Sequence, residues 1–274
     1  CRTYFSIEKE KAMIQKTIQF LLIICLLTYV VFSQQRLLVI GGGDRTPDIL
    51  QKIAQESGGD KGKLLVIPWA GGEQQEYFDA FKKDVETVSK IQFIKGAFRP
   101  LTEQSKAEFL QQLKEATGIY FTGGDQNRVM EVLQDKQLLQ AIREKYKSGT
   151  FFCGSSAGTA IMSKIMITGE GDFKVIDGNK VETKEGIGLL SEAIVDQHFI
   201  VRQRQNRLLG LVLKYPNLLG VGIDEDTALF VKNNRTGEVL GNSQVMIFDA
   251  KKEPMKVFLL KKGERFDLQK RKKL

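Results

Sequence analysis

Apolar runs of strand length alternate with amphipathic segments along the first half of the chain. The apolar runs, which end at glycine or polar clusters, are residues 36–40, 63–67, 91–94, 118–122 and 150–153. Between them, apolar residues recur at helical spacing from Pro47 and over residues 73–88, 102–116, 127–133 and 136–147. Strands that alternate with helices predict an α/β fold with a doubly wound, mostly parallel sheet flanked by helices.

The second half of the chain is less regular. Residues 165–168, 193–195 and 218–223 read as strands, Asp177-Gly178 is a hairpin turn signal, and a helix opens near Arg202 and stops at Pro216. Residues 229–232, 244–248 and 256–260 alternate like antiparallel strands that close one edge of the sheet toward the C-terminus. Because no linker interrupts residues 35–274, the sequence predicts a single domain there.

Glycine clusters follow the predicted strands, at the sheet edge where parallel α/β proteins bind ligands. The first cluster, residues 41–43, partly matches a dinucleotide fingerprint. Thr46, however, occupies the third glycine position, and no acidic residue ends a second strand at the required distance. We interpret this cluster as a strand-to-loop turn and predict no organic cofactor.

Residues 1–34 precede the predicted domain. A lysine and an apolar run over residues 20–32 follow Met13, and a small polar stretch ends the segment, which is typical of a signal peptide cleaved near residues 33–35. Residues 1–12 then represent an over-extended start. We expect a secreted or periplasmic enzyme without stable membrane association after cleavage; an uncleaved membrane anchor is the alternative.

The composition excludes several classes of function. The 274 residues are 42% hydrophobic and carry a formal charge of +8, but the basic residues are dispersed except in the tail, which disfavours nucleic-acid binding. His198 is the one histidine, so sites built on two histidines are unavailable and we predict no metal. Cys153, with apolar neighbours, is expected to be a buried, unreactive thiol.

The segment at residues 150–162 carries the strongest candidate chemistry. Its Gly154-Ser155-Ser156-Ala157-Gly158 stretch is a G-x-S-x-G pattern between a predicted strand and a predicted helix. In that context the turn exposes the serine hydroxyl beyond the sheet, and the following backbone N–H faces the position where an oxyanion would form. We therefore predict Ser156 as a nucleophile and Ala157 as an oxyanion donor.

A serine nucleophile that uses an imidazole has only His198 available. The orienting acid could precede the histidine, between residues 157 and 197, or follow it at Asp224, Glu225 or Asp226. The second order is favoured because that acidic turn ends a strand predicted to lie in the same sheet as the serine. The three acids of the turn are not distinguished by this argument.

Several motifs together resemble the cyanophycinase family, whose fold is like that of class I glutamine amidotransferases and which is grouped with aspartyl dipeptidase. They are G-G-G after the first strand, F-T-G-G-D-Q, G-S-S-A-G-T-A-I-M, G-I-G-L-L, D-Q-H-F followed by R-Q-R-Q-N-R-L, and G-I-D-E-D-T-A-L. The resemblance covers residues 36 to about 230. Ser155 and Thr159 depart from the pattern, which usually has threonine and alanine at these positions.

The resemblance implies roles for individual residues. It assigns a triad of Ser156, His198 and Glu225, with Gly124 as a second oxyanion donor beside Ala157. It also implies a substrate pocket made by Gln126, Asp196, Gln197, Arg202, Arg204 and Arg207. The implied partner is cyanophycin, a polyaspartate that bears arginine on each side-chain carboxylate, cleaved by an exopeptidase to β-Asp-Arg dipeptides.

Two alternatives remain at this point. An aspartyl dipeptidase-like enzyme would hydrolyse short acidic peptides by the same mechanism, and a non-catalytic domain on this fold would only bind them. The sequence also leaves the oligomeric state open, a homodimer included.

Overall fold

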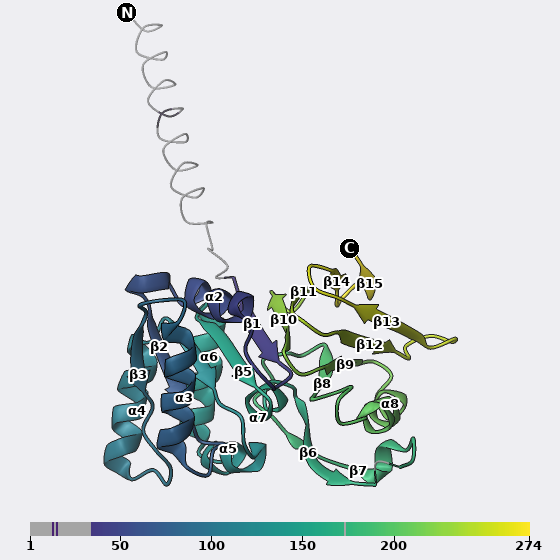
Figure 1. Ribbon diagram of the computed structural model, residues 1–274, viewed down its shortest axis with the longest axis horizontal. Coiled ribbons are helices and arrows are strands. Elements are labelled where there is room, and N and C mark those ends of the chain that lie inside the picture. The colour runs from purple at the N-terminus through teal and green to yellow at the C-terminus, as the bar shows by residue number, and fades with distance from the viewer. Residues whose placement is uncertain (1–12, 14, 16–33, 173) are drawn as a thin grey trace, which may run out of the picture. The chain divides into compact units, whose positions relative to one another are not determined.

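The computed structural model describes Met13, Gln15 and residues 34–172 and 174–274. The predicted signal peptide and early start therefore fall almost entirely outside the described residues. Residues Gln34–Leu274 form one compact unit (Figure 1). A search of the described residues finds no helix that is both long and apolar enough to span a bilayer.

A nine-stranded sheet forms the centre of this unit, in the order β15-β14-β11-β10-β1-β5-β4-β2-β3. The parallel part pairs β1 with β5, β5 with β4, β4 with β2 and β2 with β3. These strands are β1 (Arg36–Ile40), β2 (Lys63–Ile67), β3 (Gln92–Lys95), β4 (Gly118–Phe121) and β5 (Phe151–Ser155). The predicted α/β class with its parallel sheet is confirmed.

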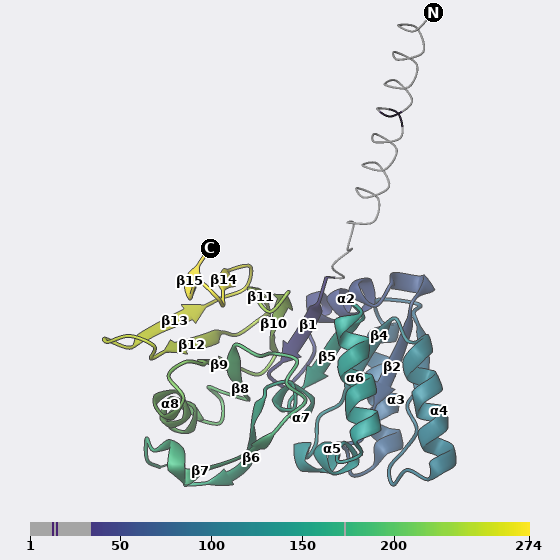
Figure 2. The ribbon, with the colours of Figure 1, turned by 180° about the vertical axis from the view of Figure 1, so that it is seen from behind.

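Helices cover both faces of the parallel strands (Figures 1 and 2). Alternate residues of β1 enter different cores: Leu37 and Val39 pack with α4 (Glu103–Glu115) and α6 (Lys136–Lys147), whereas Leu38 and Ile40 pack with α2 (Pro47–Glu56) and α3 (Gln74–Glu86). This is why the strands read as continuous apolar runs: both of their faces are buried. A short helix, α5 (Gln126–Val132), follows β4, and η1 (Gly59–Lys61) precedes β2.

Antiparallel strands extend the sheet beyond β1. They are β10 (Thr227–Lys232), β11 (Thr236–Gly241), β14 (Arg265–Asp267) and β15 (Lys272–Lys273). The predicted antiparallel strands toward the C-terminus are thus present, although not all of them belong to this sheet.

A second, four-stranded sheet has the order β13-β12-β9-β8. Its strands are β8 (Ala193–Gln197), β9 (Leu219–Ile223), β12 (Val245–Asp249) and β13 (Lys256–Leu260), and α8 (Gln205–Lys214) packs on β8 and β9. The expectation that the strand before Asp224 lies in the serine's sheet is therefore wrong. A continuous apolar run gives no information on which sheet a strand joins, because long-range pairing decides it.

The remaining elements connect the two sheets. The short helix α7 (Ala157–Ala160) follows β5, and β6 (Ile165–Gly171) pairs antiparallel with β7 (Val181–Glu185) around η2 (Gly178–Lys180), as the Asp177-Gly178 signal predicts. Cys153 is fully buried in β5, and this burial raises the pKa of its thiol well above the usual value. The prediction of a buried thiol is confirmed.

Candidate active site

Ser156 lies on a sharp turn between β5 and α7, with φ 52° and ψ −110°. A Cβ added to Gly154 would lie 2.1 Å from the Gly158 carbonyl oxygen, and one added to Gly158 would lie 2.2 Å from that of Phe121. Both flanking positions therefore require glycine. The positive φ of a serine is a strained conformation that a tight strand-to-helix turn imposes.

The chain of polar contacts begins at this serine. Ser156 Oγ lies 2.8 Å from His198 Nε2, and His198 Nδ1 lies 2.5 Å from Glu225 Oε1. The serine belongs to the nine-stranded sheet, whereas the other two side chains follow β8 and β9 of the second sheet. The site is thus assembled where the carboxyl ends of strands from two sheets meet.

The three carboxylates of the acidic turn after β9 have different hydrogen-bond partners. Asp224 is buried and accepts hydrogen bonds from the backbone N–H groups of Ile200 and Val201. Asp226 accepts one from the N–H of Asp44. Among the described residues, Glu225 alone of the three hydrogen-bonds to the imidazole, which the argument from strand ends did not distinguish.

The loop after β1 holds the imidazole from the other side. The backbone N–H of His198 donates to the carbonyl of Gly41, and a Cβ added to Gly42 would lie 2.2 Å from His198 Cε1. Gly42 has φ +113°, so any other residue would be strained as well as in collision with the ring. The glycine cluster that resembled a fingerprint therefore lies against the histidine.

Burial lowers the pKa of the His198 imidazole below its usual 6.5. The hydrogen bond to Glu225 opposes this shift, while the charges of Arg202 and Arg204 add to it. The imidazole is therefore neutral at neutral pH and can accept a proton at Nε2 from the serine.

The two predicted oxyanion donors are Ala157 and Gly124. Ala157 is the first residue of α7. Gly123 lines the cavity beside Ser156, and its added Cβ would lie 3.5 Å from Ser156 Cβ, whereas one on Gly124 would collide with the carbonyl of Ala70. The roles of Ala157 and Gly124 remain predictions.

The residues predicted for the substrate pocket fall into two groups. Gln126 is buried and its Nε2 donates to the carbonyls of Ile167 and Thr168 at 2.8 and 2.7 Å. Asp196 and Arg207 are both buried and form a two-point ion pair, with N–O distances of 2.7 and 2.5 Å. These contacts direct their polar groups toward the protein.

The second group lies closer to the histidine. Arg204 Nη1 donates to the backbone carbonyl of Gln197 at 2.8 Å and also contacts its side-chain oxygen. Burial, with the nearby charge of Arg207, lowers the pKa of Arg204 to about 10. Arg202 is half exposed and its Nε lies 3.9 Å from Glu225 Oε1. Arg202 is therefore the more accessible cation beside the triad.

Replacing Asp196 with alanine is expected to lower the free energy of unfolding by about 3–5 kcal/mol. The substitution removes the carboxylate that accepts hydrogen bonds from Nε and Nη2 of the buried Arg207 guanidinium. Urea unfolding measures this. As a control, Glu185→Gln removes a carboxylate that pairs with Arg143 at the surface, and a change below about 1 kcal/mol is expected. Equal losses in the two variants would contradict the structural role of the buried pair.

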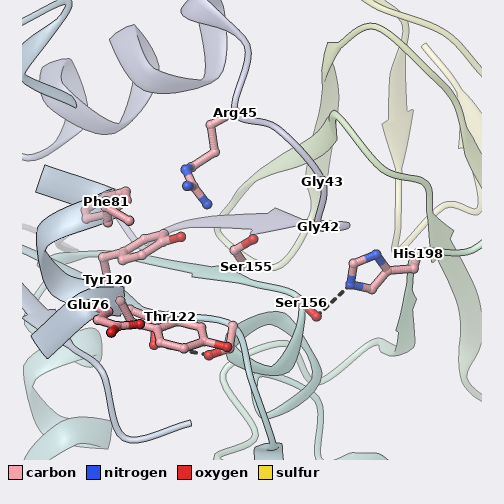
Figure 3. A pocket seen from close by; sticks show the side chains of 13 residues that line it. Gly42, Gly43, Arg45, Glu76, Phe81, Tyr120, Thr122, Ser155, Ser156 and His198 are labelled. Carbon is pink, nitrogen blue, oxygen red and sulfur yellow. Dashed lines mark hydrogen bonds between the residues drawn. The ribbon is translucent and has the colours of Figure 1, made fainter. Parts of the chain in front are cut away.

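A cavity of about 390 Å³ opens beside Ser156 (Figure 3). Arg45, Glu76, Tyr77 and Tyr120 line it together with the Gly42-Gly43 loop. None of these residues is among the site residues predicted from the sequence. The glycine cluster before Arg45 was the one available signal, and it shows only that a strand ends there.

The chain matches the model of peptidase family S51 over residues 37–239. It belongs to this family and is a serine peptidase. It is 33% identical over 223 residues to a cyanophycinase from Nostoc sp., covering 79% of this chain and 74% of that protein. A cyanophycinase from Synechococcus elongatus is 34% identical over 220 residues, with 77% and 67% covered.

The fold is also similar to a solved structure, that of a peptidase from an acI-B1 Actinobacterium. Its TM-score is 0.66 at 22% identity, with 86% of this chain and 98% of that chain covered. This likeness supports the fold.

No group of three or more His, Cys, Asp or Glu side chains suited to a metal occurs within the described ranges.

Proposed function

We propose that this peptidase hydrolyses cyanophycin to β-Asp-Arg dipeptides through an acyl-enzyme. The observation that carries the proposal is the contact chain from Ser156 through His198 to Glu225, which opens onto a charged cavity. The identity of about a third to two cyanophycinases supports the choice of substrate.

The geometry suits acyl transfer. His198 Nε2 takes the proton of Ser156 Oγ while the oxygen attacks the α-peptide carbonyl, and Glu225 accepts the Nδ1–H of the resulting imidazolium. The N–H groups of Ala157 and Gly124 would stabilise the tetrahedral oxyanion. The C–N bond then breaks as the imidazolium protonates the leaving amine, and water attacks the ester by the same route.

Charged groups of both signs surround this chemistry, as the substrate requires. Each cyanophycin branch carries a carboxylate and a guanidinium. Arg202, which is half exposed beside Glu225, can bind a substrate carboxylate, and Arg204 adds positive potential. In this proposal Asp196 and Arg207 position β8 and α8 rather than touch the polymer.

We further propose that the enzyme acts outside the cytoplasm. The apolar segment that follows Met13 supports export. N-terminal sequencing of the mature protein from an expressing cell would test this: a terminus near residues 33–35 is expected, and one at residue 1 or Met13 would overturn it.

The decisive experiment incubates the purified protein with insoluble cyanophycin and follows clearing, with mass identification of the products. Release of β-Asp-Arg is expected. Soluble Asp-X dipeptides are tested in parallel, because hydrolysis of these without clearing of the polymer would instead establish the acidic-dipeptidase alternative. Binding without any hydrolysis would favour a non-catalytic domain.

The acidic limb of the pH profile of kcat/KM is expected to have its midpoint below pH 6.5, because the base must be neutral and burial lowers the pKa of His198. Arg202→Gln removes a positive charge that lowers this pKa, so the limb should move to higher pH. Arg235→Gln, on the distant β10–β11 turn, serves as a control that should leave it in place. A limb above pH 6.5 would contradict the assignment of the base.

A further inference from the structure

The cavity beside Ser156 is lined by other residues than those that the family resemblance placed in the substrate pocket. Its walls come from the loop after β1, from α3, and from the ends of β4 and β5 (Figure 3). Ser156 and His198 belong to its lining, but within the described part of the chain none of the six residues implied for the substrate pocket does. Its volume of about 390 Å³ falls in the range of small-molecule sites, about 300–1,000 Å³.

Arg45 is the cation of this cavity. Its Nε and Nη2 both contact Asp84 Oδ2, at 3.0 and 2.5 Å, and its guanidinium carbon lies 5.7 Å from the centre of the Phe81 ring. The side chain is only 20% exposed and points toward Tyr120 and Ser155 (Figure 3). Because α3 holds the guanidinium in place, little entropy is lost when it binds an anion.

Tyr120 and Tyr77 supply the polar and aromatic walls. The Tyr120 ring stacks on Phe81 at 3.6 Å between centroids, and burial raises the pKa of its hydroxyl to about 12, so it stays a neutral hydrogen-bonding group. Tyr77 packs on the backbone of Gly71, where an added Cβ would lie 2.6 Å from the ring. The cavity therefore has one buried aromatic wall, at Tyr120, and one more exposed wall, at Tyr77.

Glu76 places a carboxylate at the same cavity. It is exposed, on the first turn of α3, and lines the cavity next to Tyr77. A cation and an anion thus face one space from opposite elements, the loop after β1 and the helix α3 (Figure 3).

We propose that this cavity is a subsite for one arginyl branch of the polymer next to the scissile bond, with Arg45 binding the branch carboxylate and Glu76 its guanidinium. The inference rests on the proposed function. Each branch carries one charge of each sign, which matches Arg45 and Glu76 of the cavity. Because Asp84 is bound at Nε and Nη2 of Arg45, the branch carboxylate would take the N–H groups of the planar guanidinium that Asp84 does not use. A short acidic peptide has no arginyl guanidinium for Glu76 to bind, so the subsite favours the polymer over the acidic dipeptide.

Binding is measured by calorimetry in the Ser156→Ala background, with a soluble trimer of β-Asp-Arg units as the probe. Arg45→Gln and Glu76→Gln are each expected to raise Kd about tenfold, as for the loss of one charge-assisted contact. Arg235→Gln and Glu86→Gln, which change surface charges outside the cavity, are matched controls and should leave Kd within twofold.

Two modified trimers make the test specific. In one, citrulline replaces arginine, so Glu76→Gln should weaken its binding no further; in the other, the branch carboxylates are amides, so Arg45→Gln should have no added effect. Variants that weaken all three ligands equally would indicate a structural effect and overturn the proposal.

The outcomes separate the subsite from the function. Suppose that the parent enzyme clears cyanophycin and that the Kd for the trimer is the same with and without the Arg45 and Glu76 substitutions. The subsite is then refuted and the proposed function stands. A parent that clears the polymer without binding the trimer refutes the subsite as well. If the parent neither clears the polymer nor binds the trimer, both proposals fail.

Discussion

Ser156→Ala is expected to reduce turnover of cyanophycin by at least about 10⁴-fold while leaving binding intact. The alanine removes the oxygen that lies 2.8 Å from His198 Nε2. Ser155 lines the same cavity, but within the described residues its hydroxyl makes no hydrogen bond to the histidine. No neighbouring hydroxyl can therefore take its place without moving the turn. The removed hydroxyl contacts the histidine rather than the protein core, so the fold should be unchanged.

Product release measured by mass spectrometry tests this result, and co-sedimentation with polymer granules tests binding. Ser148→Ala is the matched control, because its hydroxyl lies on the surface, where it donates to the carbonyl of Lys145, and full activity is expected. Residual turnover above about one per cent in Ser156→Ala would show that another group is the nucleophile.

Glu225→Gln is expected to lower kcat by about 10³- to 10⁴-fold with little change in KM. The glutamine keeps the shape of the side chain but removes the charge that stabilises the imidazolium 2.5 Å away. An amide can also donate to Nδ1, which would favour the wrong tautomer and leave Nε2 protonated. Because Glu225 raises the pKa of His198, the acidic limb of the remaining activity should also move to lower pH.

Asp226→Asn is the control, since this carboxylate belongs to the same turn but accepts a hydrogen bond from Asp44 instead of the histidine. We expect a loss of about tenfold or less. If Glu225→Gln and Asp226→Asn lost activity equally, the orienting acid would not be Glu225. If the acidic limb of the pH profile stayed in place in Glu225→Gln, the result would argue against an electrostatic role of Glu225.

Much of this site could be predicted from the sequence because local chemistry specifies it. The spacing of Gly154, Ser156 and Gly158 predicts a tight turn that leaves no room for a Cβ at the two flanking positions, and the backbone has that turn. The sequence also predicts His198 as the base, because the chain has no other histidine. The choice among Asp224, Glu225 and Asp226 needed the family resemblance, because consecutive residues on one turn differ only in the direction of their side chains.

Other features depend on contacts between distant segments, and here the sequence was insufficient. The family resemblance implies a pocket role for Asp196 and Arg207, which stays a prediction, but no local pattern predicts that α8 packs on β8 and that the two residues form a buried ion pair. Arg45 and Glu76 carry no motif at all; they become neighbours of one cavity only after the loop after β1 and α3 fold onto the same sheet edge.

Local sequence patterns are enough to predict the strands and helices of the parallel half, the nucleophile turn and the single histidine that can act with it. Periodicity and glycine spacing are local properties, so they survive without knowledge of the fold. The three-dimensional arrangement was needed to show that the serine and the histidine follow strands of different sheets and which charges face the cavity, and it places the Glu225 carboxylate on the imidazole, as the family resemblance implied. Those outcomes follow from long-range strand pairing and side-chain packing, whose free energies depend on residues far apart in the chain.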